Sequence, residues 1–353
     1  MVEGNIKKVL DIITRKKRVW NERSTQAVET VNMYMARYAN VRDSYSEQYP
    51  TGLPILVSGQ VQRSGGTLFS QLFDGHSEIM VHPHEILLLK GGYFTVRDLK
   101  RRVCRTKNAF SIINRNGYTK GSVDGGIHPL FFNGELFLKK VMSQRCKNRN
   151  EVISFYFDNF FKYWVNYNNF NLHCREKKLI CGFSPRLGLP NLGTLLDENP
   201  RITFVHIYRN PCSWWVSSRL HCQRQKTYED ISSIDTQWKV NQNVALESLK
   251  THPRQTIILS FDDLITQTER VMKVFCKRFE IAYDDVLKVP TFNNKPIGAD
   301  SSFKTNKEPG KINVEPTERY KKILDNGEID FINTRNGELM NQMNGLSNSF
   351  FEI

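Results

Sequence analysis

The sequence lacks the long apolar runs that mark a membrane-spanning protein. The longest apolar stretches, such as residues 54–57 and 86–89, are far shorter than the roughly 18 residues needed to cross a bilayer. The first 20 residues also lack the uninterrupted apolar core of a signal peptide, because lysines, arginines and an aspartate separate the aliphatic residues. We therefore expect a cytoplasmic protein with no transmembrane segment.

Cysteine is scarce and has no regular spacing. The seven cysteines include no Cys-x-x-Cys pair, so the sequence predicts neither a structural zinc site nor a disulfide framework. We expect the cysteines to be reduced residues that fill the core.

The remaining composition is that of a globular protein with an excess of positive charge. Of the 353 residues, 39% are hydrophobic and 24% are charged, which excludes collagen-like, disordered and disulfide-scaffold proteins. The 50 lysines and arginines exceed the 36 acidic residues, leaving a formal charge of +14 that favours an anionic partner. No nucleic-acid-binding module accompanies the basic runs at 97–107 and 139–149, so we do not expect nucleic acid.

The order of apolar segments predicts an α/β protein with a central parallel sheet flanked by helices. Residues 1–50 have helical spacing and are interpreted as an N-terminal helical extension, and the main domain spans residues 51–353. Short apolar runs predict strands, and the segments between and after them predict helices. The expected strands begin at residues 55, 179, 202 and 256, and the expected helices include 155–170, 212–221, 268–279 and a final one near 317–324.

A strand that runs into a loop with two glycines and then a helix is the first candidate site. The segment is Arg63-Ser64-Gly65-Gly66-Thr67-Leu68. Amides at a helix N-terminus bind anions, glycines allow close approach, hydroxyls donate hydrogen bonds and an arginine neutralises phosphate. A tight turn without a ligand is the alternative. The segment 63–68 is not a Walker A loop, because Thr67-Leu68 stand where that loop needs Lys and Ser or Thr.

The second candidate segment is Arg209-Asn-Pro, with Ser217 eight residues after the arginine. Arg209 ends a predicted strand, and Pro211 fits the first position of a helix because its missing amide is not needed there. Arg209 and Ser217 are therefore candidates to bind one phosphate beside that helix, although arginines often end strands without binding anything.

Together the two segments resemble those of sulfotransferases that use 3′-phosphoadenosine 5′-phosphosulfate (PAPS), in particular the bacterial type, whose fold is P-loop-like and has three α/β/α layers. The resemblance covers roughly residues 53–330. It implies that residues 63–68 bind the 5′-phosphosulfate and that Arg209 and Ser217 bind the 3′-phosphate. It also implies that PAPS is the co-substrate and that no metal is needed.

Two positions depart from the family pattern. Gly66 stands where members often have threonine, so one hydroxyl donor is missing. Phe183-Ser184-Pro185 replaces an element that often begins with lysine, and Arg186 is a candidate substitute for that cation.

The general base is expected in His82-Pro-His84-Glu85, where related sulfotransferases carry a catalytic glutamate. Glu85 is the first choice, and an alignment without gaps favours His84, whose ordinary pKa suits a base. His128 is a third candidate, and a polar turn without a catalytic role is the alternative for this cluster.

The function expected from the resemblance is transfer of the sulfuryl group to a hydroxyl or amine. A P-loop-type nucleotide kinase and a noncatalytic nucleotide-binding protein remain the alternatives. The class of acceptor, the oligomeric state and the role of residues 1–50 stay open. Aromatic residues within 155–164 are candidates to line an acceptor pocket or to pack in a helix core.

Overall fold

A computed structural model describes most of the chain from residue 50 onward. The described residues are 50–86, 137, 140, 143, 144, 146, 148–163, 176–185, 192–224, 227, 230–292, 294–298 and 308–352, with the backbone alone at 84, 85, 185 and 224. The N-terminal extension expected over residues 1–50 lies outside them except for its last residue, as do His128, Arg186 and most of the two basic runs.

Five parallel strands form the central sheet, in the order β2-β3-β1-β4-β5. The strands are β1 (Ile55–Gln60), β2 (Ile79–Glu85), β3 (Leu179–Pro185), β4 (Ile202–Tyr208) and β5 (Thr256–Ser260). A separate antiparallel pair is formed by β6 (Thr291–Phe292) and β7 (Lys295–Pro296). The predicted parallel sheet is therefore confirmed.

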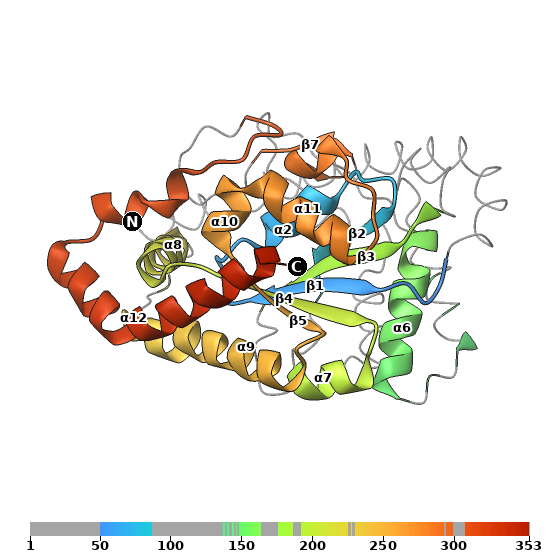
Figure 1. The fold of residues 1–353 in the computed structure, drawn as a ribbon, viewed down its shortest axis with the longest axis horizontal. Coiled ribbons are helices and arrows are strands. Elements are labelled where there is room, and N and C mark those ends of the chain that lie inside the picture. The colour runs from blue at the N-terminus through green and yellow to red at the C-terminus, as the bar shows by residue number, and fades with distance from the viewer. Residues whose placement is uncertain are drawn as a thin grey trace, which may run out of the picture.

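Helices cover both faces of this sheet. They are α2 (Gly66–Phe73), α6 (Arg149–Phe160), α7 (Leu192–Glu198), α8 (Pro211–Arg224), α9 (Val240–Thr251), α10 (Phe261–Thr266), α11 (Thr268–Arg278) and α12 (Asn326–Ser349). A π-helical segment, Ile234–Lys239, leads into α9. Short 3₁₀ turns occupy Phe161–Tyr163, Asp285–Lys288, Glu315–Thr317, Arg319–Lys322 and Phe350–Glu352. In Figure 1, α2, α10 and α11 lie above the strands, and α7 and α9 lie below them.

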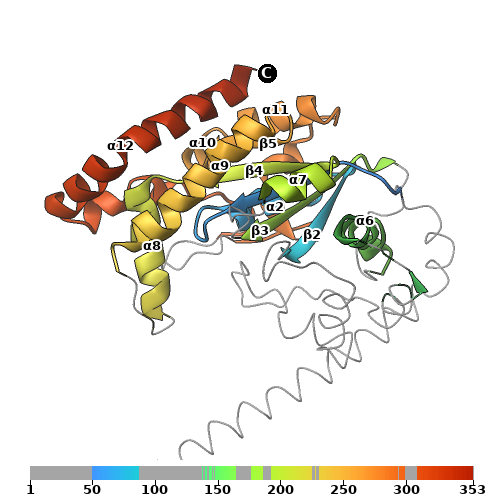
Figure 2. The same cartoon turned by 90° about the horizontal axis from the view of Figure 1, so that it is seen from below.

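Alternation along β1 divides the core between the two faces. Ile55 and Val57 belong to the apolar cluster that includes α6 and α7. Leu56 belongs to the opposite cluster, with the apolar side chains of α2, α10 and α11. Because successive side chains of a strand point to opposite faces, one short strand anchors both layers. Figure 2 shows the same elements turned by 90°.

Strand β2 was not among the predicted strands. It contains Pro83, which cannot donate to a ladder and is tolerated at sheet edges, and β2 is the edge strand. Its pairing with β3 shifts between Val81 and Glu85, as expected where an irregular residue interrupts the register. A polar turn was the alternative for His82–Glu85, and these residues lie in a strand instead.

The prediction of a final helix near 317–324 is wrong. That segment forms two 3₁₀ turns, and the final helix is α12, which begins after Asp325. Asp325 and Glu328 form a capping box, in which each side chain accepts from the other residue's amide. The helix is rich in asparagine and contains three glycines, so its apolar periodicity is weak.

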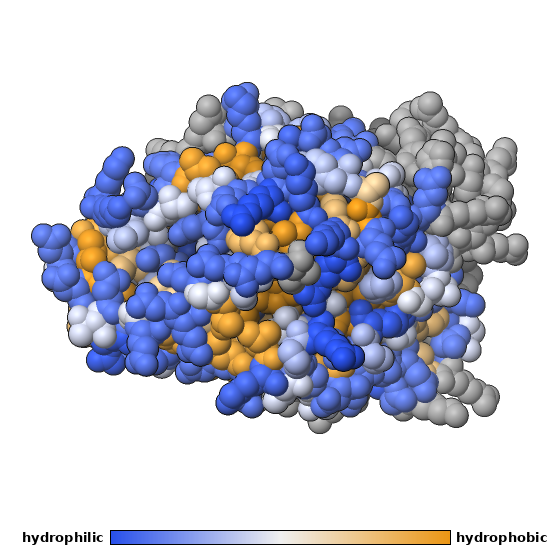
Figure 3. Space-filling view, in the orientation of Figure 1, coloured by the Kyte–Doolittle hydropathy of each residue, from blue (hydrophilic) through white to orange (hydrophobic). Residues whose placement is uncertain are grey.

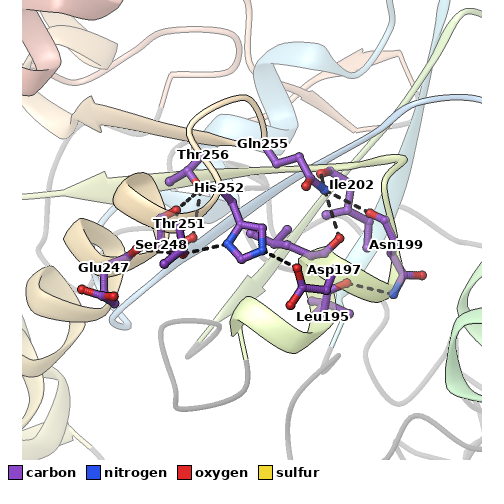
Figure 4. A network of polar contacts seen from close by, with 11 residues as sticks. Leu195, Asp197, Asn199, Ile202, Glu247, Ser248, Thr251, His252, Gln255 and Thr256 are labelled. Atoms are coloured by element: carbon purple, nitrogen blue, oxygen red, sulfur yellow. Dashed lines mark hydrogen bonds and ion pairs between the residues drawn. The ribbon is translucent and has the colours of Figure 1, made fainter.

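Polar contacts at the amino ends of β4 and β5 join α7 to α9 (Figure 4). His252 Nε2 contacts Asp197 Oδ1 at 2.9 Å, and the Gln255 amide donates to the carbonyl oxygens of Asn199 and Ile202. This network is at the opposite end of the strands from the loop that follows β1, so its histidine serves the fold.

The described surface is mainly polar. Figure 3 shows hydrophilic side chains over most of the face in view, with smaller apolar areas between them. Among the described residues, no helix is both long enough and apolar enough to span a membrane.

Candidate functional site

The candidate site lies where β1 ends and the chain turns into α2. Arg63 has a φ of 73° and Gly65 a φ of 97°, so two residues of this loop adopt left-handed conformations. A non-glycine residue in that region is uncommon and costs about 1–3 kcal/mol unless its surroundings hold it. The strain at Arg63 therefore has to be offset by contacts from neighbouring segments.

Position 65 requires glycine for two reasons, its positive φ and the packing of Phe261 against it. A Cβ at this position would lie 2.6 Å from Cε2 of Phe261, the first residue of α10. The phenyl ring thus packs directly on the glycine, and the loop cannot move away from α10 without opening the core.

The N-terminus of α2 has features that favour an anion. No side chain caps the helix, and its first turn contains no acidic residue. Ser64, directly before it, is fully buried, and its hydroxyl has no hydrogen-bond partner among the described residues. Free amides, the positive end of the helix and an unsatisfied hydroxyl are together suited to a phosphate or sulfate. Thr67 and Leu68 follow in the first turn and are partly exposed.

Arg209, at the end of β4, reaches back to this loop. Its guanidinium donates from Nη1 to the carbonyl oxygen of Arg63 at 3.2 Å and from Nη2 to that of Pro316 at 3.0 Å. The guanidinium carbon lies 4.7 Å from the centre of the Phe261 ring. Arg209 is 6% exposed, and its Nε is buried with no partner among the described residues.

Ser217 lies in α8 and is brought to the same place. Its hydroxyl oxygen accepts a hydrogen bond of 3.4 Å from Nε of Arg63. Trp214, one turn earlier in α8, donates from its indole to the carbonyl oxygen of Gln62 at 2.8 Å. The structure therefore brings Arg63, Arg209 and Ser217 together, with Arg63 in contact with the other two.

The start of α8 follows the prediction made from Pro211. The proline is the first helical residue, and the Asn210 side chain accepts from the amides of Cys212 and Ser213 at 2.9 and 3.2 Å. The first-turn amides of α8 are thus capped by Asn210, whereas those of α2 have no such cap.

The charges around Arg209 are mostly positive. Burial lowers the pKa of Arg209 to about 10, Asp262 opposes this effect, and the neighbouring Arg63 and Arg319 add to it. Burial raises the pKa of Asp262 to about 6, with Asp263 adding to the shift and Arg209 opposing it. Two further arginines therefore lie near Arg209, and the carboxyl groups of Asp262 and of Glu315, the ion-pair partner of Arg319, oppose their charge.

A chain of buried polar contacts holds the end of β4 in place. Trp238 Nε1 donates to the carbonyl oxygen of Arg209 at 2.8 Å, and the Gln242 amide donates to that of Trp238. Gln242 Oε1 in turn lies 2.6 Å from Nε2 of His206, and burial lowers the pKa of that histidine to about 4. Burial therefore keeps this histidine neutral, although the contact with Gln242 acts in the opposite direction, and the chain of contacts supports the backbone at Arg209.

The proposed base residues lie on the edge strand. His84 and Glu85 are at the carboxyl end of β2, and Glu85 is paired with Phe183 of β3. Their side chains are outside the described part of the structure. His82, on the same strand, is buried, and its Nε2 lies 2.7 Å from the hydroxyl of Tyr156 in α6.

The element that departs from the family pattern lies directly beside β1. Phe183 is opposite Ser58 and Ser184 is opposite Gly59, with both side chains buried.

The aromatic residues of α6 pack in the core. Phe155 and Phe160 are buried within the core cluster, as expected if these residues form a helix core and do not line an acceptor pocket. Trp164 falls outside the described residues.

Several residues around the site were not predicted from the sequence. Phe261 packs on Gly65 of the loop, and Pro316 and Arg319 lie beside Arg209, and none of the three was named as a site residue. Arg319 is 8% exposed and forms an ion pair of 2.8 Å with Glu315. The basic run that contains Arg319 is a signal in the sequence, but nothing local to it indicates which segment it contacts.

Comparisons with known proteins found one matching family and several similar structures. A family model described as the sulfotransferase family matches residues 54–285. Similar solved structures include the sulfotransferase domain from the curacin biosynthetic pathway, with 16% identity over 81% of this chain and 98% of that chain and a TM-score of 0.49. The sulfotransferase domain from the Synechococcus PCC 7002 olefin synthase has 16% identity over 81% and 95%, also with a TM-score of 0.49. Sulfotransferase STF9 from Mycobacterium avium has 12% identity over 74% of each chain and a TM-score of 0.30. No curated protein sequence matches.

Proposed function

The chain belongs to the sulfotransferase family, and from this premise we propose that it transfers the sulfuryl group of PAPS to a hydroxyl or amine of an acceptor. The observation that carries this proposal is the convergence of Arg63, Arg209 and Ser217 beside the uncapped N-terminus of α2. Two positive side chains, free amides and a buried hydroxyl without a partner match the needs of a ligand with two separated phosphate groups.

The residues divide between the two ends of the nucleotide. In this proposal, the amides of residues 65–68 and the hydroxyls of Ser64 and Thr67 bind the 5′-phosphosulfate. Arg209 and Ser217 bind the 3′-phosphate, to which the buried Nε of Arg209 is able to donate. The contact between Arg63 and Ser217 keeps the two half-sites at a constant separation.

Arg63 also stabilises the leaving group. When the acceptor oxygen attacks sulfur, the bond from sulfur to the 5′-phosphate oxygen breaks and negative charge develops on that oxygen. A guanidinium already positioned beside the loop lowers the energy of this charge, as in phosphoryl transfer.

The acceptor proton passes to a base at the end of β2, for which we propose Glu85, with His84 as the alternative. Both stand at the carboxyl end of a strand that is two positions from β1 in the sheet. Residues at the carboxyl ends of parallel strands share one edge of the sheet, which is where ligands bind in open α/β folds.

The described residues contain no group of three or more His, Cys, Asp or Glu side chains that would hold a metal. In our proposal, Arg63, Arg209 and the α2 amides balance the charge of the nucleotide. The cytoplasmic location stays a prediction from the sequence.

A comparison of nucleotides tests the proposal. Adenosine 3′,5′-bisphosphate at 100 times its Kd should stabilise the protein by about 2.7 kcal/mol, measured as a rise in melting temperature, and ATP should stabilise it much less. Preference for ATP would instead favour the nucleotide kinase, and no response to either would reject the nucleotide site. Labelled PAPS with a panel of carbohydrates, lipid headgroups, phenols and tyrosine peptides would then identify the class of acceptor.

A further inference from the structure

Gln60, the last residue of β1, has a buried amide with an unsatisfied group. The residue is 3% exposed, and its Oε1 has no hydrogen-bond partner among the described residues. Because Oε1 is an acceptor, an anion cannot satisfy it, and the part of this amide that is able to bind an anion is the Nε2 donor.

The amide lies at the start of α2. Alternation along β1 places Gln60 on the same face as Leu56, and α2 covers that face. A Cβ on Gly66 would overlap Nε2 of Gln60 and lie 2.8 Å from its Cδ, so the donor end of the amide is the part nearest to Gly66. The Gln60 amide therefore occupies the space that a side chain at position 66 would fill.

This placement accounts for Gly66. Family members often have threonine there, and this chain lacks the hydroxyl donor of that threonine. A carboxamide supplies two N–H donors, and it lies beside helix amides that no side chain caps. The oxygens of a phosphosulfate are acceptors that match those donors.

We propose that Gln60 is a further binding residue for the 5′-phosphosulfate, with its amide replacing the hydroxyl that Gly66 lacks. This inference rests on the proposed function. The inference goes beyond that function because it assigns a ligand contact to a strand residue outside the loop.

Two ligands that differ at the 5′ position test this role by calorimetry. Gln60→Ala should bind adenosine 3′,5′-bisphosphate about 10-fold more weakly than the wild type, the loss expected for one hydrogen bond to a charged group. Its affinity for adenosine 3′-monophosphate, which has no 5′-phosphate, should change by less than about twofold.

Gln71 provides a matched control. It is a buried glutamine in α2, and its Nε2 also lacks a partner among the described residues. Gln71→Ala removes the same kind of side chain from α2, the helix that packs on Gln60, and should leave the affinity for both nucleotides unchanged. Equal affinity of wild type and Gln60→Ala for the bisphosphate would overturn the role of Gln60 alone, whereas a wild type that binds neither nucleotide would overturn the proposed function with it.

A double substitution tests directly whether the Gln60 amide takes the place of a side chain at position 66. Gly66→Thr should lower both the melting temperature and the bisphosphate affinity, because its side chain collides with the Gln60 amide. The double variant with Gln60→Ala and Gly66→Thr should regain much of the lost melting temperature and bisphosphate affinity. The threonine hydroxyl then occupies the space that the Gln60 amide has left. If the double variant is no better than Gly66→Thr alone in either measurement, the two positions are not interchangeable and the inference is wrong.

Discussion

Arg209 donates a hydrogen bond from Nη1 to the backbone carbonyl oxygen of Arg63, across 3.2 Å and 146 residues of sequence. The two segments proposed to bind opposite ends of the nucleotide are therefore in direct contact. Since Arg63 has a left-handed backbone, this bond also helps to hold the strained loop. A substitution of Arg209 should affect both the 3′-phosphate and the shape of the loop.

Arg209→Ala should weaken binding of adenosine 3′,5′-bisphosphate by roughly 10- to 100-fold, the range expected for a buried charge-assisted contact. Binding of adenosine 5′-phosphosulfate should fall less, because that ligand has no 3′-phosphate. Calorimetry with both ligands measures the difference. Equal losses would mean that Arg209 acts only through the loop.

Ser217→Ala should also weaken binding of adenosine 3′,5′-bisphosphate more than binding of adenosine 5′-phosphosulfate. The loss should be smaller than for Arg209→Ala, because the substitution removes a neutral hydroxyl. Arg219→Ala is the matched control for Arg209. Arg219 lies in the same helix as Ser217, but its guanidinium pairs with Glu328 at 3.1 Å. Its removal should leave both affinities unchanged.

Gly65→Ala should destabilise the protein by about 1–3 kcal/mol, because it adds a Cβ to a left-handed residue packed against Phe261. Gly337→Ala should instead stabilise it by about 0.5–1 kcal/mol, since Gly337 lies inside α12 and a Cβ there meets no atom within 4 Å. Urea unfolding of the two variants measures both changes, and a similar loss in each would contradict the role given to Phe261.

Asp262 should make stability depend on pH. Its pKa is raised from 3.8 to about 6 in the folded state, chiefly by burial, so between these values the folded protein binds more protons than the unfolded chain. Stability contributed by the protonated carboxyl is therefore lost as the pH rises from about 4 to about 6. Asp262→Asn cannot ionise and should gain about 1–3 kcal/mol relative to the wild type across this window. Unfolding curves with parallel pH profiles for the two proteins would show that Asp262 does not titrate in this way.

Glu85→Gln should lower kcat by roughly 10²- to 10⁴-fold while PAPS binding is retained, because general-base catalysis contributes about this much. His84→Ala should have a much smaller effect. The measurement is transfer of labelled sulfate to an acceptor from the panel, with binding of PAPS followed separately.

The opposite pattern would assign the proton transfer to His84. In that case Glu85→Gln turns over at a near-normal rate, and His84→Ala binds PAPS without transferring sulfate. Loss of PAPS binding in both variants would indicate that this part of β2 is structural, and His128 would be the next candidate.

The sequence by itself determined the local features of this protein. Burial of apolar residues within a single strand or helix is visible in a short window, so β4 and β5 have the predicted bounds and α8 begins within a residue of its prediction. The glycine loop before α2 and the start of α8 at Pro211 also depend on neighbouring residues alone, and both were predicted, whereas the Asn210 cap was not. Where local signals were weak, as at Pro83 in β2 and in the asparagine-rich α12, the prediction failed.

Only the tertiary structure decided which of these features meet. The sheet order places β1 between β3 and β4, so the loop after β1 lies beside Arg209, and the helix that follows Arg209 presents Ser217 to Arg63. Pro316, 107 residues beyond Arg209, supplies the second carbonyl oxygen to its guanidinium. No residue pattern encodes these contacts, because they depend on how distant segments cross one edge of the sheet. The position of Gln60 beneath Gly66 arises in the same way, from a strand and a helix that pack face to face.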